Sequence, residues 1–329
     1  MELEARRDAD LDAFLVRHTP WPPHELPAVL RDLRREFAQA LDDLTAIPGD
    51  TLERAWRWRA DVAEAEGLEV ELRYAFYRAY EALDEAAGRI RRGRAGPAGG
   101  AGPSLLSDAF AARWDLRGAL AGATDRTLDR DPGGGEWTVR QTLAHIVGGQ
   151  RAFTWFSAWW ADRRDASDFP ARVPDDAVPG FPDEEDEAPG GLEAIFARLD
   201  HVIELGLRRF GSAPPDVLDA RARWSGYPVT VAFRLGRTGS HIREHTVQVD
   251  KTLEMLSRDD DDARQRDHSE IPRLVRVVCG AYGRLEAAVI EASSKAGTHG
   301  DGESPEAIAR AAVVSLASDV RDARQAASG

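Results

Sequence analysis

The chain has 329 residues, with 43 Lys and Arg against 57 Asp and Glu, which gives a formal net charge of −14. This acidic balance argues against broad binding to nucleic acid or to anionic membranes, because both depend on clustered positive charge. With 43% hydrophobic residues the chain can bury a folded core, so wholesale disorder is excluded.

A single cysteine, Cys279, excludes intramolecular disulfides and any cysteine-based zinc site, and such a chain suits a reducing cytoplasm. The first residues lack the apolar run of a signal peptide, and no uncharged apolar stretch approaches the roughly 20 residues of a membrane span. Arginine almost replaces lysine, which occurs only at Lys251 and Lys295, as is typical of a GC-rich bacterial genome. We therefore expect a cytoplasmic bacterial protein without a membrane partner.

Helical periodicity runs through the chain, whereas strand signals are nearly absent, so the sequence predicts an all-α fold. Apolar residues three and four positions apart predict amphipathic helices over residues 26–44 and 70–90. A stretch rich in glycine, alanine and proline follows at residues 93–103 and is the clearest linker. Residues 1–92 are thus predicted to form an N-terminal helical region.

Beyond the linker, the same periodicity predicts four further helices, at residues 105–121, 138–163, 192–210 and 229–256. The connection at residues 165–191 is rich in proline, glycine and acidic residues. Its length lets the third helix run in the same direction as the second, which is the topology of a four-helix bundle with a crossover. The acidic runs at residues 183–187 and 259–262 are predicted to be solvated loops, because they lack the alternating ligands and turn glycine of a calcium site.

The predicted organisation is a four-helix bundle over residues 104–257 with helical regions on both sides. Residues 258–329 are predicted to be an acidic linker followed by C-terminal helices. Two helices alone bury their apolar faces poorly, so we expect the flanking helices to pack together as a second small helical module. The sequence leaves open whether this module is a separate domain or a buttress of the bundle.

Two of the eight histidines, His241 and His245, are four residues apart on the last predicted bundle helix. Because this spacing is slightly more than one helical turn, both imidazoles project from one face and can chelate a single ion. They belong to a longer polar stripe that also contains Arg234, Arg237, Thr238, Gln248 and Thr252. The alternative is a solvent-exposed face with hydrogen-bonded histidines, since a metal site needs a third ligand from another helix.

His145 is the candidate for that third ligand. Thr138 and Gln141 have the spacing of a capping box, which predicts a helix start there and places His145 two turns into the helix. Gly148 and Gly149 follow, although glycine costs about 1 kcal/mol in a helix interior. These small residues either leave room for a bound guest or allow close helix packing.

The pattern Trp-Thr-x-x-x-x-Leu-x-His that ends at His145, together with His241-x-x-x-His245, resembles a known family. It is similar to the DinB/YfiT-like superfamily of metal-binding four-helix bundles and to the related mycothiol-dependent maleylpyruvate isomerase branch, over residues 104–256. The resemblance implies a DinB-like bundle that binds a divalent ion, often zinc or nickel, through His145, His241 and His245. In the isomerase branch the first position of the last motif is often Glu, so His241 is a departure that weakens the case for isomerase activity.

Three neutral imidazoles with an open fourth position describe a catalytic rather than a closed structural zinc site. Such an ion can lower the pKa of bound water toward about 7, or bind and deprotonate a thiol. Arg234 and Arg237 are candidates to hold an anionic substrate by charge-assisted hydrogen bonds. Gln141 and Gln248 are candidates to orient a ligand or a bound water. Each of these side chains is alternatively an ordinary surface residue.

Two function classes stay open. The resemblance implies a metal-dependent transferase, isomerase or hydrolase that acts on a small electrophile, with a low-molecular-weight thiol such as mycothiol or bacillithiol as cofactor. The alternative is a non-catalytic metal-binding or stress-response module. The net charge of −14 argues against nucleic acid as a partner. The oligomeric state stays undetermined, with a homodimer as one option.

Overall fold

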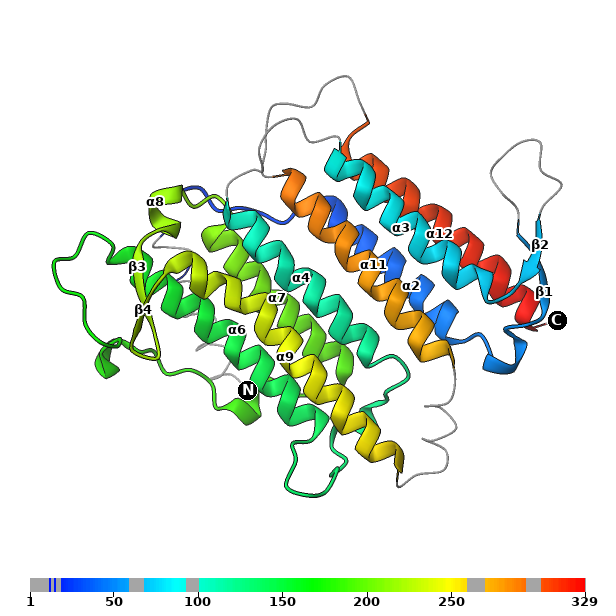
Figure 1. Cartoon of the computed structure of the whole chain (residues 1–329), viewed down its shortest axis with the longest axis horizontal. Helices are drawn as coiled ribbons and strands as arrows, with labels where there is room; N and C mark the ends of the chain where they lie inside the picture. Colours follow the sequence, from blue (N-terminus) through cyan, green and yellow to red (C-terminus); the bar gives the residue numbers. More distant parts are fainter. Residues whose placement is uncertain are drawn as a thin grey trace. The chain divides into compact units, whose positions relative to one another are not determined.

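The computed structural model of the chain describes residues 12, 15, 19–58, 68–92, 101–258, 270–293 and 303–328 (Figure 1). Helices make up most of these residues, which confirms the predicted all-α class. None of the helices in this part of the chain combines the length and the apolar character needed to cross a lipid bilayer. By their contacts the described residues divide into two compact units: unit 1 lies within 1–26, 97–113 and 123–256, and unit 2 within 27–96, 114–122 and 257–329.

Unit 1, as far as it is described, is built from the helices α4 (Ala101–Ala119), α6 (Val139–Asp162), α7 (Leu192–Phe210) and α9 (Val231–Arg258). Shorter helical turns connect them, namely α5 (Asp125–Leu128), η2 (Asp175–Ala177), η3 (Glu184–Glu187) and α8 (Pro215–Leu218). The long helices lie close to their predicted bounds. Helix α4 is divided between the two units: its residues up to Arg113 belong to unit 1, and the rest belong to unit 2.

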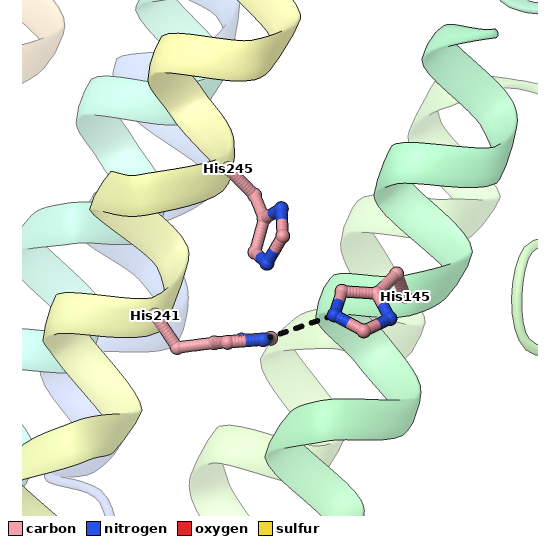
Figure 2. A group of neighbouring side chains, drawn as sticks. All are labelled: His145, His241 and His245. Atoms are coloured by element: carbon pink, nitrogen blue, oxygen red, sulfur yellow. Dashed lines mark hydrogen bonds between the residues drawn. The ribbon is translucent and has the colours of Figure 1, made fainter. Parts of the chain in front are cut away.

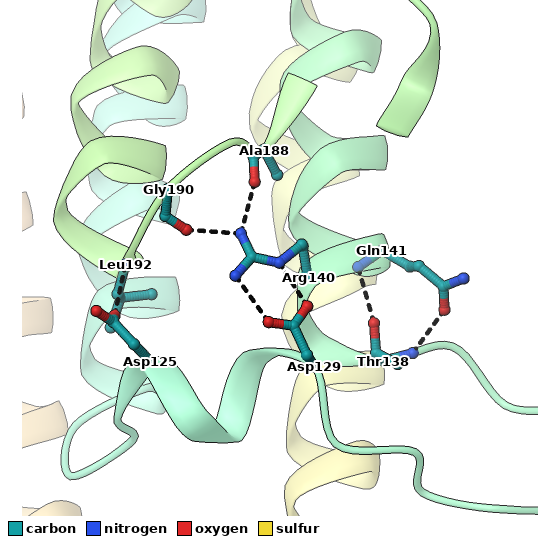
Figure 3. Close-up of polar contacts among 8 residues, drawn as sticks. All are labelled: Asp125, Asp129, Thr138, Arg140, Gln141, Ala188, Gly190 and Leu192. Carbon is teal, nitrogen blue, oxygen red and sulfur yellow. Dashed lines mark hydrogen bonds and ion pairs between the residues drawn. The ribbon is translucent and has the colours of Figure 1, made fainter. Parts of the chain in front are cut away.

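Helices α6 and α7 run in the same direction, as the long connection between them predicts. Arg140, in the first turn of α6, donates to the carbonyl oxygen of Gly190 just before α7 (2.7 Å; Figure 3). The carboxylate of Asp125 accepts from the backbone N–H of Leu192, the first residue of α7 (2.9 Å). Both helices therefore begin at the same end of the bundle, and residues 163–191 form the crossover.

One face of α9 is buried because its apolar residues repeat every seven positions. Leu235, Ile242 and Val249 are each 0% exposed. Seven residues are nearly two helical turns, so these side chains share one face and anchor the helix in the core. His241 and His245 project from α9 beside this face and point toward α6 (Figure 2).

Two short β-hairpins were not expected from the sequence. In unit 1, β3 (Arg221–Trp224) pairs antiparallel with β4 (Tyr227–Thr230), and in unit 2, β1 (Ala55–Trp58) pairs antiparallel with β2 (Leu68–Glu71). The β3–β4 turn places Ser225 and Gly226 at φ of 48° and 85°, as a tight two-residue hairpin loop requires. Four-residue strands are too short for their alternation to stand out from helical periodicity. The helices that follow therefore begin later than predicted, at Val231 and Tyr74.

Unit 2 contains the helices that flank the bundle in sequence: α2 (Ala28–Thr45), α3 (Tyr74–Arg92), α11 (Glu270–Ser293) and α12 (Pro305–Ser328), with the short turn η1 (Gly49–Thr51). Helix α11 packs against α3, and α12 packs against both α2 and α3. In this core the ring of Phe37 stacks on that of Tyr282, with centroids 4.0 Å apart. Buried Glu286 accepts hydrogen bonds from Arg34 (2.7 Å) and from the Trp114 indole (3.1 Å). Helices from both ends of the chain thus share one core.

The predicted division of the chain at residues 93–103 and 258 stays a prediction, because compact units do not establish which segments fold by themselves. Residues 93–100 of the predicted linker and residues 259–269 of the acidic segment lie outside the described residues. Residues 101–103 belong to α4, so its helix begins slightly earlier than predicted.

Candidate metal centre

Helices α6 and α9 lie beside one another and are antiparallel. Near the start of α6, the carbonyl of Trp137 accepts a hydrogen bond from the hydroxyl of Thr252 (3.3 Å). Further along α6, the side-chain amide of Gln150 donates to the carbonyl of Thr238 (3.0 Å). Later residues of α6 therefore contact earlier residues of α9. This arrangement brings residues of the first half of α6 beside residues of the first half of α9.

At this point His145 of α6 meets His241 and His245 of α9 (Figure 2). One ring nitrogen from each lies within 4.8 Å of the other two. The Nε2 atoms of His145 and His241 are 3.3 Å apart. Two zinc–nitrogen bonds of about 2.0–2.1 Å at a tetrahedral angle also place their nitrogens about 3.3 Å apart. The structure thus brings together the three histidines on which the sequence prediction rests, in a group that could hold one metal ion.

The approach of His241 to α6 depends on Gly149. A Cβ atom at this position would lie 2.5 Å from Cε1 of His241, closer than side chains approach one another. At Gly148 a Cβ would meet only Cγ of Glu187 at 3.6 Å, an ordinary contact. Of the two interpretations of this glycine pair, close packing applies at Gly149, where the imidazole of His241 fills the space.

Two of the three rings are oriented by oxygen acceptors. Nδ1 of His145 lies 2.6 Å from Oε1 of Glu184, and Nδ1 of His245 lies 2.9 Å from Oε1 of Gln248. A carboxylate or an amide oxygen only accepts, so each Nδ1 carries the proton and donates it. The lone pair of each ring is then on Nε2, the atom that faces the other histidines. Neutral imidazoles in this tautomer are ready to bind a metal.

His241 is the most buried of the three histidines, with 6% of its surface exposed. Burial, together with the neighbouring His245 and His145, lowers the pKa of His241 to about 3. The ring is therefore neutral at physiological pH, which is the form that binds a metal. Its buried Nδ1 has no hydrogen-bond partner among the described residues.

Aromatic side chains flank the cluster. Trp137 lies nearly parallel to His245, with centroids 6.4 Å apart and 14° between the planes, and it also contacts His145 at 5.2 Å. Phe153 meets His241 edge-on at 5.0 Å and touches Trp224 on its other side at 5.2 Å. Trp137 and Phe153 thus place apolar surface beside the imidazoles.

The other sequence candidates have different surroundings. The side chain of Gln141 closes the capping box by accepting from the backbone N–H of Thr138 (2.9 Å; Figure 3). Arg237 forms a two-pronged ion pair with Glu244 (2.8 and 2.9 Å), which lowers the pKa of that carboxyl. Gln248 contacts His245 directly. Of these three polar candidates, Gln248 is the one hydrogen-bonded to a histidine of the cluster.

Arg234 is 6% exposed, and burial lowers its pKa to about 10. Its Nη1 donates to the carbonyl of Arg223 (2.5 Å), and its guanidinium lies over the Trp224 ring at 5.1 Å. Among the described residues no carboxylate pairs with it, and its buried Nε has no partner. This arginine is seven residues before His241 and shares its face of α9.

Glu184 and Glu187 were missed by the sequence analysis, and the prediction of a solvated loop is wrong for Glu187. Its carboxylate is 1% exposed and accepts from Nε of Arg151 (2.8 Å) and Nε of Arg198 (3.0 Å). Nothing in an acidic run distinguishes a carboxylate that meets a histidine or a buried arginine from one in water. To make that distinction, one must know where the folded crossover lies against α6.

Residues 111–249 match the family model of the DinB superfamily. The matched segment contains all three histidines and confirms the predicted resemblance to the DinB superfamily. It covers less than half of the chain and includes none of α2, α3, α11 and α12. Comparison of the chain with curated proteins and with solved structures found no match.

Proposed function

We propose that this protein is a metal-dependent enzyme whose centre is a divalent ion, zinc or nickel, held by His145, His241 and His245. The observation that carries the proposal is the convergence of three imidazoles from two helices within the DinB segment. Three nitrogen ligands leave room in a tetrahedral site for a water or a substrate atom. The proposed reaction is a transfer, isomerisation or hydrolysis on a small electrophile.

When bound, the ion would supply Lewis acidity that lowers the pKa of a bound water or of a low-molecular-weight thiol such as mycothiol or bacillithiol. The protein's own residues hold and shield it. His145 and His245 present Nε2 because their Nδ1 protons are engaged. Trp137 and Phe153 keep apolar surface beside the ligands. A reducing cytoplasm, the proposed compartment, keeps such thiols reduced.

We further propose that Arg234, rather than Arg237, holds an anionic group of the substrate. Arg237 is already paired with Glu244, whereas no described carboxylate pairs with Arg234. A buried cation without a counter-charge is costly, and an anionic ligand would offset that cost. In Arg234→Met the KM for an anionic substrate should rise more than in Arg237→Met.

The test of the metal centre is elemental analysis of the full chain purified without a His-tag. We expect about one zinc or nickel per chain, as one three-histidine site implies, and its loss in His241→Ala. His201→Ala is the matched control, because His201 bonds to Asp12 (2.7 Å) and is not part of the cluster. It should keep the metal.

Absence of metal after reconstitution would contradict the proposal. The loaded protein is then assayed with thiol and small electrophiles. If the protein binds metal but shows no turnover, either with any thiol or with water alone, a non-catalytic metal-binding module is favoured. Loss of turnover in His145→Ala would support catalysis at the centre.

A further inference from the structure

The crossover between α6 and α7 supplies a carboxylate to the histidine cluster. Oε1 of Glu184, in η3, lies 2.6 Å from Nδ1 of His145. This distance is that of a short, charge-assisted hydrogen bond. Because the carboxylate cannot donate, it selects the tautomer of His145 whose lone pair is on Nε2. Nε2 is the atom that lies 3.3 Å from Nε2 of His241.

An exposed ion pair is worth little by itself, because two flexible side chains must be ordered to make it. The Glu184 side chain is 53% exposed. Its contact with His145 therefore depends more on where the backbone of Glu184 is held than on the strength of the hydrogen bond itself. That backbone is held three residues later by Glu187. Buried Glu187 binds Arg151 of α6 and Arg198 of α7 through short hydrogen bonds (2.8 and 3.0 Å).

This anchor ties η3 to the helix that carries His145. Arg151 is on α6 six residues after the histidine, and Cγ of Glu187 lies near Gly148 between them, at 3.6 Å from where a Cβ of residue 148 would stand. The crossover is therefore fixed to α6 within two turns of the imidazole. Glu184 reaches His145 from a backbone that is already in place.

The other two ligands are held differently. His245 is bonded to Gln248 on its own helix, and the buried Nδ1 of His241 has no partner among the described residues. Of the three rings, His145 is thus the one whose Nδ1 meets a negative charge. A carboxylate behind a ligating imidazole fixes the ring and raises the basicity of the ligating nitrogen.

We propose that Glu184 is the positioning residue of the metal centre, which orients His145 for the ion from the crossover, with Glu187 as its buried anchor. This inference rests on the proposed metal-binding function. It assigns to the acidic segment of the crossover a role in metal affinity. Glu184 acts through His145 and is not itself a ligand.

The experiment measures the zinc affinity of the full chain by competition with a chromogenic chelator. Glu184→Ala should weaken zinc binding about 10- to 100-fold, as loss of a carboxylate behind a ligating histidine does elsewhere. Glu184→Gln should lie between Glu184→Ala and the wild type, because an amide oxygen still accepts from Nδ1 but carries no charge. Glu185→Ala, which removes the same charge from the exposed neighbouring residue, should bind zinc as the wild type does.

A second readout uses the metal-free protein. Ring ¹⁵N chemical shifts, assigned with His145→Ala, should show His145 protonated on Nδ1 in the wild type and in Glu185→Ala. In Glu184→Ala the ring should shift toward a mixture of tautomers. A side chain that merely packed the loop would change the thermal midpoint without changing this tautomer.

The outcomes separate the inference from the function on which it rests. If the wild type binds no zinc, the proposed function fails and the inference fails with it. If the wild type binds zinc and Glu184→Ala binds it equally well, the inference alone is overturned. Equal weakening in Glu184→Ala and Glu185→Ala would also overturn it, because the effect would then come from the general negative charge of the crossover.

Discussion

At the scale of single residues, the three histidines of the cluster are held in three different ways. His145 is oriented by a carboxylate from the crossover, and His245 by Gln248 on its own helix. His241 has neither, and its position depends on the absence of a side chain at Gly149. Its burial also keeps the ring neutral, with a pKa lowered to about 3. The properties of each imidazole thus come from its immediate contacts.

Gly149→Ala is expected to disrupt the metal centre. A Cβ at residue 149 would lie 2.5 Å from Cε1 of His241, so the ring must move from its place beside His145 and His245. Zinc affinity, measured by chelator competition, should fall at least about tenfold. This loss should occur although alanine is a better helix former than glycine by about 1 kcal/mol.

Gly148→Ala is the matched control, because it makes the same change one residue earlier on α6. Its Cβ would meet Cγ of Glu187 at 3.6 Å, an ordinary distance. We expect wild-type zinc affinity and a thermal midpoint that is unchanged or higher. Equal zinc affinity in the two variants would contradict the role assigned to Gly149.

At the scale of elements, the start of α6 determines where its side chains point. The hydroxyl of Thr138 accepts from the backbone N–H of Gln141 (3.2 Å), and the side-chain oxygen of Gln141 accepts from the backbone N–H of Thr138 (2.9 Å; Figure 3). Trp137, directly before this cap, contacts the rings of His145 and His245. The cap thus holds both the helix start and one aromatic wall of the site.

Thr138→Ala should cost about 1 kcal/mol of unfolding free energy, the typical value of a lost N-cap. Because the cap also places Trp137 beside the histidines, we expect weaker zinc binding as well. Chemical denaturation and chelator competition measure the two effects separately.

Ser304→Ala is the control for this prediction. Its hydroxyl caps α12 in unit 2 by accepting from the backbone N–H of Ala307 (3.1 Å). It should lose a similar free energy, about 1 kcal/mol, with unchanged zinc affinity. Zinc binding that stays the same in Thr138→Ala as well would argue that the cap serves stability alone.

At the scale of the whole molecule, neither of the two units is one continuous segment of the chain. Unit 2 combines helices from before and after the bundle, and α4 contributes residues to both units. Trp114 of α4 donates to buried Glu286 of α11 (3.1 Å), which also binds Arg34 of α2. A core built from distant segments requires all of them to be present.

Truncation after Leu256 should therefore destabilise α2 and α3. It removes α11 and α12, against which both helices pack, and exposes the face of Phe37 that stacks on Tyr282. We expect circular dichroism to show a greater loss of helix than the removed residues account for, together with rapid proteolysis of residues 28–92. An unchanged melting curve for the remaining helices would contradict this prediction.

The sequence by itself predicted the long helices and the histidine face, because both depend on local spacing. Periodicity located α4, α6, α7 and α9, and the four-residue step placed His241 and His245 on one side of α9. The capping box located the start of α6, which in turn placed His145. The four-residue hairpins were missed, since so short a strand leaves no distinctive pattern.

The tertiary structure decided which side chains meet. Glu184 is 39 residues from His145 in sequence, and Glu187 is 36 from Arg151, so no local pattern relates them. The same holds for Gly149, whose missing side chain matters only because His241 of another helix lies against it. Local spacing determines the face on which a residue lies, whereas burial and pairing depend on the segment packed against that face, and only the folded chain brings that segment there.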